Sequence, residues 1–325
     1  MLLSRRFVLA FAVLGSVVAA ARADDYPTRR ITLIAPWPAA GAIDTLCRQL
    51  APGLGDRLGQ PVIVENRPGA GSTIGTADGA KAEPDGYTLV MAGSGSLAIS
   101  PTLYKKLPYD PRQDFTPVAL VGEIPFILVV NPSLPIHSPA ELIKYAADHP
   151  GTLTYASGGA GSPHQLYAEL FKSMTGIAMT HVPYKGNSPA LTDVIGGHVS
   201  LMFADSTVLP MVKAGQVRAL GASSLTRLPS APEIPPLAEA GVPGFNAAGW
   251  DMIVAPAHTP ASIVAKLHDA IGAVEVQPEI QEHIIALGLT PKLGTPSDQL
   301  QGFIDTEMER WGKVVQGAGL AGSQD

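Results

Sequence analysis

Short runs of β-branched and apolar residues alternate along this chain with segments that have the period of amphipathic helices. Alternation of this kind packs helices against largely parallel sheets, so the sequence predicts an α/β fold. The expected strands are Ile31–Ala35, Val62–Glu65, Thr88–Met91, Ile127–Val130, Thr152–Tyr155, Met179–Val182, Val199–Phe203, Ala219–Ser223 and Ile253–Ala255. The expected helices are Ile43–Leu54, Pro139–Asp148, Gln165–Ser173, Ser188–Ile195, Leu209–Ala214, Pro260–Val274, Pro278–Leu287 and Pro296–Val315.

The first 23 residues have the parts of a secretory signal peptide. Arg5 and Arg6 precede an apolar run over residues 7–21, and Ala21-Arg22-Ala23 forms an A-x-A cleavage site. The run is shorter than the roughly 20 apolar residues of a membrane-spanning helix. We therefore expect export with cleavage near Ala23, by the general secretory or the twin-arginine route.

Cleavage there would leave 325 − 23 = 302 residues and remove three arginines, so the net charge becomes −6 − 3 = −9. An acidic chain is a poor partner for nucleic acid, whose binding depends on Lys and Arg at phosphates. The single cysteine, Cys47, excludes an intramolecular disulfide. We expect Cys47 in the core, where free cysteine is commonly found.

A chain of this length predicts two domains. Two segments are candidate crossings between them, namely Val118–Val130, which runs through Pro125, and Gly249–Met252. Two crossings make a discontinuous first lobe of residues 24–128 and 252–325, with residues 129–251 as an inserted second lobe. We expect a ligand to bind between the two lobes.

Three loops of small and polar residues, Pro36–Asp44, Met91–Ser96 and Tyr155–His164, follow predicted strands. Ligands of open α/β sheets bind beyond the carboxyl ends of strands, and exposed N–H groups at helix starts suit an anion. The first loop read alone is equally compatible with a plain tight turn, but small polar loops after three separate strands are hard to explain as turns alone. The ligand-binding residues predicted from the loops are Trp37, Ala39, Ala40, Gly41, Ala42, Asp44, Ser94, Ser157, Gly161, Ser162 and His164.

Alternative roles remain open for several polar residues. Asp44 is able to cap or abut its own helix, and His164 is able to pack against a helix instead of binding a ligand. Asp205 ends a predicted strand, where it would accept a hydrogen bond from a ligand or cap the next helix. Tyr184, which also follows a strand, offers a phenol and completes the predicted site.

Other classes of site find little support. Gly69–Gly75 has GxGxxxG spacing, which differs from the dinucleotide fingerprint, and none of the eight histidines lies at metal-ligand spacing. We expect neither a metal nor a cofactor. A hydrolase would need Ser157 or Ser162 activated by His164, which is the alternative to a binding protein. We expect a receptor and not an enzyme.

Motifs spread over nearly the whole mature chain carry a family resemblance. They are Glu65–Gly71, Pro84–Leu89, Leu107–Pro111, Val129–Ser133, His181–Gly186, Pro189–Asp193, Gly196-Gly197, Lys213–Gly215 and Ala255–Pro260. On these motifs the chain resembles the Bug family of periplasmic receptors, also described as the substrate-binding proteins of tripartite tricarboxylate transporters.

The resemblance implies a type II periplasmic-binding-protein fold, in which two α/β lobes joined by a hinge close on a small carboxylate. It also implies a periplasmic location and, as possible partners, a transporter membrane component or a sensor. We expect a monomer, the default for such receptors. In the family, loops that match Pro36–Asp44 and Ser157–His164 grip ligand carboxylates.

This chain departs from the family pattern in both loops. Trp37 and Ala40 replace the usual Phe and the first glycine of a pair, and Ala160 stands where Asn is common. The second loop is also one residue shorter than in many members. The identity of the carboxylate therefore does not follow from the resemblance.

Overall fold

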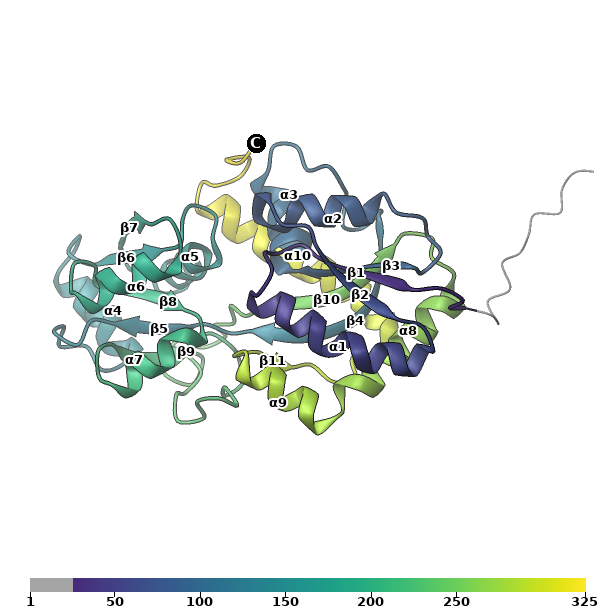
Figure 1. Cartoon of the computed structure of the whole chain (residues 1–325). Helices are drawn as coiled ribbons and strands as arrows, with labels where there is room; N and C mark the ends of the chain where they lie inside the picture. The colour runs from purple at the N-terminus through teal and green to yellow at the C-terminus, as the bar shows by residue number, and fades with distance from the viewer. Residues whose placement is uncertain (1–25) are drawn as a thin grey trace, which may run out of the picture.

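The computed structural model describes residues 26–325, and the predicted signal peptide lies outside them. Two lobes stand side by side, each built on one sheet (Figure 1). The first sheet has the order β11-β4-β10-β3-β1-β2, and the second has the order β7-β6-β8-β5-β9.

The first sheet consists of β1 (Ile31–Ala35), β2 (Val62–Asn66), β3 (Thr88–Gly93), β4 (Phe115–Ile124), β10 (Gly249–Pro256) and β11 (Thr290–Pro291). Its helices are α1 (Ala42–Leu58), α2 (Thr73–Ala80), α3 (Ser100–Leu103), α8 (Ala261–Glu275), α9 (Pro278–Ala286) and α10 (Leu300–Gly317).

The second sheet consists of β5 (Ile127–Val130), β6 (Thr154–Ser157), β7 (Thr180–Pro183), β8 (Leu201–Ala204) and β9 (Arg218–Ala222). The helices of this lobe are α4 (Pro139–Asp148), α5 (Pro163–Thr175), α6 (Asn187–Ile195) and α7 (Leu209–Lys213).

The carboxyl ends of the mutually parallel strands in both sheets meet at the boundary between the lobes. Strands β1, β2 and β3 are parallel, and so are β6, β7 and β8. Because β10 runs antiparallel to both β3 and β4, β4 ends at the same edge as β3. The chain leaves β4 at that edge and, after Pro125 and Phe126, starts β5, which runs antiparallel to β8. The loops that follow the parallel strands of the two sheets are thereby brought to one region.

The sequence misses four elements of the first lobe, namely the short α3 and β11 and the longer β4 and α2. It treats the segment of β4 as a crossing, and it assigns no helix to the glycine-containing segment of α2. Pro117 within β4 discourages a strand assignment, because proline cannot donate a ladder hydrogen bond. The predicted lobe limits stay a prediction; the chain changes sheet between Ile124 and Ile127 and again before Gly249, a few residues ahead of those limits.

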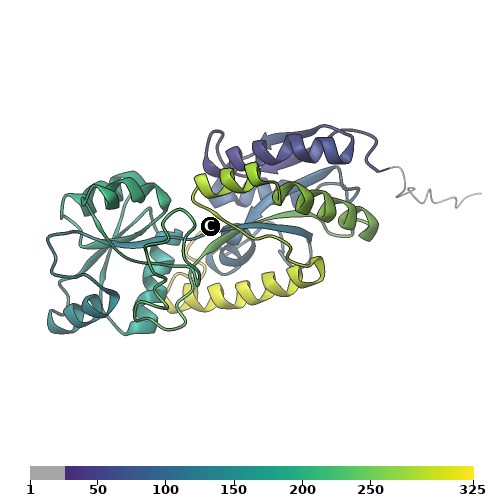
Figure 2. The ribbon, with the colours of Figure 1, turned by 90° about the horizontal axis from the view of Figure 1, so that it is seen from below.

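The lobes share a continuous hydrophobic seam on the side of α10. Helix α10 lies along the first lobe with one end against the second (Figure 2). Tyr167 of α5 stacks on Trp311 of α10, with ring centroids 5.3 Å apart. Beneath this stack, Oε2 of Glu307 accepts hydrogen bonds from the indole nitrogens of Trp250 (2.9 Å) and Trp311 (3.1 Å). Arg310 bonds the same oxygen at 2.6 Å.

Within residues 26–325, no helix has both the length and the apolar character that a membrane crossing requires. The longer helices of both lobes, such as α1 and α5, have a buried face. Cys47 is one of the fully buried residues on α1, as predicted.

We expect Glu307→Ala to lower the free energy of unfolding by about 2–4 kcal/mol, because two buried indole N–H groups and Arg310 lose their acceptor. Glu309→Ala is the matched control, since Glu309 is exposed on the same helix and its loss should change stability by less than about 0.5 kcal/mol. Urea unfolding followed by tryptophan fluorescence measures both variants. Equal effects would contradict a structural role for the Glu307 carboxylate.

Candidate functional site

The loop after β1 is shaped by the buried carboxylate of Asp44. Oδ2 of Asp44 accepts the backbone N–H of Ala40 at 2.7 Å, and Oδ1 accepts Nδ2 of Asn66 at 2.8 Å. Asn66 also donates to the carbonyl of Trp37 at 3.2 Å. Arg48, one turn further along α1, pairs with the same carboxylate at 2.9 Å and lowers its pKa. Asp44 therefore holds the predicted ligand loop in shape while staying ionised.

Ala40 adopts a left-handed backbone conformation, with φ of 64°. The side chains of Ala39, Ala40 and Ala42 are exposed, so this loop presents mainly backbone to its surroundings. A left-handed conformation costs an L-residue about 1–2 kcal/mol, which is why glycine is favoured there. The methyl group of Ala40 therefore stores strain in the loop.

We expect Ala40→Gly to leave the free energy of unfolding unchanged or raise it by up to about 1 kcal/mol, because relief of strain exceeds the entropy gained by the unfolded chain. Ala39→Gly is the matched control: Ala39 keeps a negative φ, so the same substitution should destabilise by about 0.4–1 kcal/mol. Denaturant titration measures both. Destabilisation by Ala40→Gly of the same size would rule out strain at Ala40.

Three helices begin at this edge without a side-chain cap in the described part of the chain. Helices α1, α5 and α6 have Gly41, Ser162 and Gly186 at their N-caps, and none of these supplies a capping side-chain bond. The first N–H groups of a helix have no intrahelical acceptor, so they remain available to an anion. α1 belongs to the first lobe and the other two helices to the second.

The loop after β6 is closed by its own side chains. Oγ of Ser157 lies 2.6 Å from Nε2 of His181, and it also bonds the backbone of Gly159. Ser162 donates to the carbonyl of Gly159 at 2.6 Å. Gly161 N–H donates to Oε1 of Gln165 at 2.7 Å. Both predicted serines and Gly161 are thus brought together, and the partner of Ser157 is His181, not His164.

His164 is the predicted site residue with the most unusual surroundings. Both of its ring nitrogens are buried and have no hydrogen-bond partner within residues 26–325, and the same is true of Oδ1 of Asn187 nearby. Burial lowers the pKa of His164, partly opposed by the charge of Asp205 and by the adjacent side chain of Asn187. Phe126 packs edge-on against the ring at 4.9 Å. Buried polar atoms are normally satisfied, so this cluster marks a place for a ligand or an ordered water.

Asp205 and Tyr184 have committed side chains. Asp205 accepts from Thr207 N–H at 3.0 Å, which caps the turn after β8, and from Nδ2 of Asn187 at 3.1 Å. Tyr184 donates its hydroxyl to Asp193 at 2.5 Å, and this contact raises the pKa of Tyr184 to about 12. Asp205 is therefore tied to the cluster around His164, whereas the phenol of Tyr184 is bonded to α6.

Asp251 is the residue of the first lobe that, like His164 in the second, has buried polar atoms without a hydrogen-bond partner. Its carboxyl is fully buried on β10, and neither oxygen has a hydrogen-bond partner in the described structure. A Cβ at Gly93, its partner on β3, would lie 2.7 Å from Oδ1 and 3.5 Å from the ring of Trp37. Burial raises the pKa of Asp251 to about 8. The carboxyl is therefore largely protonated at neutral pH, close to the predicted ligand loop.

The raised pKa of Asp251 makes stability depend on pH. The contribution is fully present below the unfolded pKa of about 4 and is lost at about 1.4 kcal/mol per pH unit as pH rises toward 8. We expect Asp251→Asn, which cannot ionise, to gain stability relative to the natural chain as pH rises from 5 to 8.5. Urea unfolding at several pH values measures this difference. A difference that does not change with pH would contradict a protonated Asp251.

Ser94 lies at the second crossing. Its hydroxyl is buried and accepts the N–H of Trp250 at 3.4 Å, next to Gly249. A Cβ at Gly249 would also lie 3.2 Å from the hydroxyl of Tyr167. Ser94 therefore contacts the segment that joins the lobes.

The loops of the two lobes contact each other at two points. A Cβ at Gly161 would lie 2.9 Å from the side chain of Leu103 in α3, which belongs to the first lobe. A Cβ at Gly288, between α9 and β11, would lie 1.8 Å from Oγ of Ser206 in the second lobe. The absence of side chains at these glycines permits the close approach.

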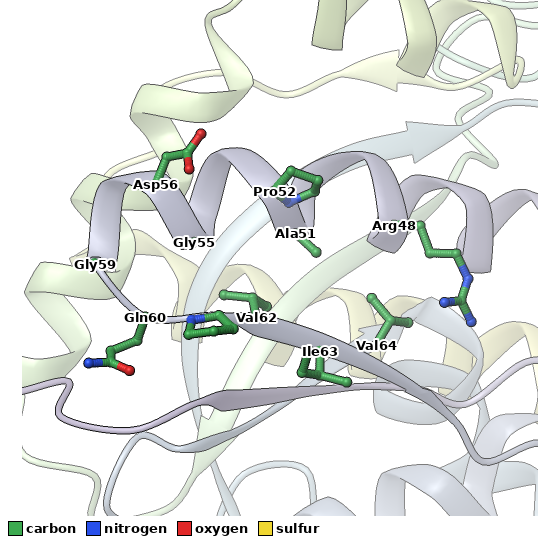
Figure 3. A pocket seen from close by; sticks show the side chains of 11 residues that line it. Arg48, Ala51, Pro52, Gly55, Asp56, Gly59, Gln60, Val62, Ile63 and Val64 are labelled. Carbon is green, nitrogen blue, oxygen red and sulfur yellow. The ribbon is translucent and has the colours of Figure 1, made fainter.

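Two cavities lie away from these loops. One, of about 830 Å³, lies between α1 and β2, with Arg48 at one end and Gln60 at the other (Figure 3). The second, of about 880 Å³, lies between α5 and α10. Within residues 26–325, no group of three His, Cys, Asp or Glu side chains is placed to hold a metal ion.

Comparison with known proteins identifies the family. The family described as the tripartite tricarboxylate transporter family receptor matches residues 46–320. This chain belongs to that family. The receptor is 39% identical over 311 residues to protein BugT of Bordetella pertussis, a match that covers 95% of each chain.

Solved structures agree with this assignment. An R. palustris protein solved with adipate is 37% identical to the receptor, with a TM-score of 0.76 over 91% of this chain and 99% of that one. MatC of Rhodopseudomonas palustris, solved with bound malate, is 32% identical, with a TM-score of 0.72 over 89% and 100%. The predicted fold, two α/β lobes of a periplasmic binding protein, is confirmed.

Sequence reasoning missed four polar residues around the two lobes' loops, and most left a readable signal. Gln165 follows the glycine loop by one helical turn, His181 begins a family motif, and Asn187 starts a helix after Gly186. Asp251 is an acid inside the apolar run Trp250–Val254, and an acid in a buried strand usually has a special role.

Proposed function

We propose that this receptor captures a small carboxylate between its lobes, using the uncapped helix starts of the first and second lobes and the buried cluster around His164. The observation that carries the proposal is the set of unpartnered atoms on His164 and Asn187 beside α5 and α6. A ligand or its bound water would satisfy them when the lobes close.

The charge of the ligand follows from the groups that the loops offer. Arg48 is paired with Asp44, and around the cluster of the second lobe the donors are backbone N–H groups at the helix starts and the ring of His164, beside the carboxylate of Asp205. Oriented N–H groups at helix starts stabilise a carboxylate without a buried cation. Adipate and malate in related structures are ligands of this chemical class.

The binding residues that we propose are among those predicted from the sequence, and they have different roles. Trp37, Ala39, Ala40, Gly41 and Ala42 form the loop of the first lobe. Gly161 and Ser162 form the second, Ser157 shapes it from beneath, and Ser94 lies at the crossing. Residues 1–23 would direct the chain to the periplasm. There, a transporter membrane component or a sensor would bind the closed, ligand-bound form.

A hydrolase is less well supported by the geometry. His164 makes no hydrogen bond to Ser157 or Ser162 in the described structure, so the pair that the alternative needed is not formed. The histidine that does contact Ser157 is constrained by Gln165, and it lacks an acidic partner that would help it accept a proton. A receptor requires no such activation.

The test is thermal unfolding of residues 24–325 with a panel of acids that includes adipate and malate. A ligand that binds the folded state alone adds about 2.7 kcal/mol at roughly 100 times Kd. We expect one acid to raise the melting temperature and to be recovered unchanged. We expect His164→Ala to weaken its binding about tenfold or more, as befits loss of one buried hydrogen bond.

The control for that variant is His283→Ala, because His283 is exposed on α9 in the first lobe. It should bind the acid as the natural chain does. Failure of every carboxylate to shift the melting temperature would contradict carboxylate capture. Chemical conversion of the acid would instead support an enzyme.

A further inference from the structure

The loop after β6 is held by a chain of hydrogen bonds between four residues. Gly161 N–H donates to Oε1 of Gln165 at 2.7 Å. Nε2 of Gln165 lies 3.3 Å from Nδ1 of His181, and Nε2 of His181 lies 2.6 Å from Oγ of Ser157. The chain therefore joins β7 and α5 to both ends of the glycine loop.

Only one arrangement of protons satisfies this chain. A backbone N–H can only donate, so Gly161 requires the amide oxygen of Gln165, and the amide nitrogen must then face His181. Nδ1 of His181 therefore accepts, and its ring proton lies on Nε2 and is donated to Ser157. The hydroxyl of Ser157 in turn donates to the carbonyl of Gly159 at 3.1 Å. A neutral imidazole with its proton on Nε2 is required.

We propose that Gln165 and His181 are positioning residues of the ligand loop and that protonation of His181 releases it, so that solute capture weakens as pH falls. The effect on capture rests on the proposed function of this loop. Neither residue needs to touch the ligand, because both act through the backbone of Gly161 and the hydroxyl of Ser157.

A second proton on His181 cannot be accommodated by turning the amide. Nδ1–H would point at the amide nitrogen of Gln165, which places two donors 3.3 Å apart. Rotation of the amide would satisfy His181 but would set its nitrogen against Gly161 N–H, 2.7 Å away. One hydrogen bond is lost in either case, between groups that are only partly accessible to water, and this loss weakens the loop.

The surroundings of His181 favour the neutral ring. Tyr155 of β6 stacks on it at 4.9 Å, and on α5 Glu169 is bound to both Tyr155 and Lys172. Burial lowers the pKa of His181, with Glu169 opposing and Lys172 adding to this effect. The opposite effects of Glu169 and Lys172 on the pKa of His181 largely cancel, so burial determines the direction of the shift.

The first measurement needs no ligand. Proton–nitrogen NMR spectra of the free protein from pH 7.5 to 4.5 report the histidine ring nitrogens and the amide of Gly161 together. At neutral pH we expect the ring proton of His181 to lie on Nε2. We also expect the chemical shift of the Gly161 amide to change with the midpoint of the His181 titration. A proton on Nδ1, or a Gly161 signal that ignores this titration, would overturn the proposal.

The Gln165→Glu variant should reverse the direction in which the order of the loop depends on pH. A carboxylate there accepts from Gly161 and also from a protonated Nδ1, so the charged form of His181 would now complete the chain. We expect the pKa of His181 to rise and the loop to be most ordered below that pKa. A purely structural role for Gln165 would not reverse the pH profile.

The second measurement is binding of adipate and malate by calorimetry across the same range. We expect Kd to rise about tenfold per pH unit below the pKa of His181, because only the neutral form holds the loop. His181→Gln keeps a donor toward Ser157 but cannot titrate, so this dependence should vanish, whereas the exposed control His283→Gln should keep it.

The two measurements separate the proton switch from the proposed function. If neither acid binds at any pH while the loop amide follows His181, the switch is upheld and carboxylate capture is contradicted. If an acid binds with the same pH dependence in His181→Gln as in the natural chain, the switch is refuted and capture is upheld.

Discussion

The arrangement of the lobes depends on a single carboxylate oxygen, Oε2 of Glu307. It gathers the indoles of Trp250 and Trp311 and the guanidinium of Arg310, which also bonds the carbonyl of Asn246. The second crossing, the C-terminal helix and, through the stacked Tyr167, the second lobe are thereby fixed on one side of the molecule. The loop of Gly161 also approaches this side, where its backbone lies against Leu103 of α3.

The two lobes offer different chemistry at that edge. The first presents a backbone loop above an ionised Asp44 and a protonated Asp251, whereas the second presents glycines and serines above a neutral His181 and a neutral His164. Protons, rather than fixed cations, therefore set the local electrostatics. An anion held here is recognised by the direction of donors, which favours shape discrimination among acids over simple charge attraction.

The architecture was largely readable from the sequence because strand and helix periods are local properties. β1, β5 and α4 have the predicted bounds, whereas β4 was hidden by Pro117 and α2 by its glycines. The loops of the candidate site could be identified from the sequence, but the contacts between their side chains could not. The pairing of Ser157 with His181, 24 residues away, depends on the parallel register of β6 and β7, which no local pattern specifies. The burial of Asp251 likewise depends on β10 entering between β3 and β4.

That insertion of β10 has a consequence for the order in which the chain can acquire structure. β3 and β4 do not pair with each other; the strand between them is made from residues 249–256, after the whole second lobe has been synthesised. Before that segment is present, β1, β2 and β3 can pair with one another but β4 has no partner, while residues 127–222 already contain every strand of the second sheet. The strands of the second lobe are thus complete in the chain before those of the first, whose sheet is closed only by residues from beyond the inserted lobe.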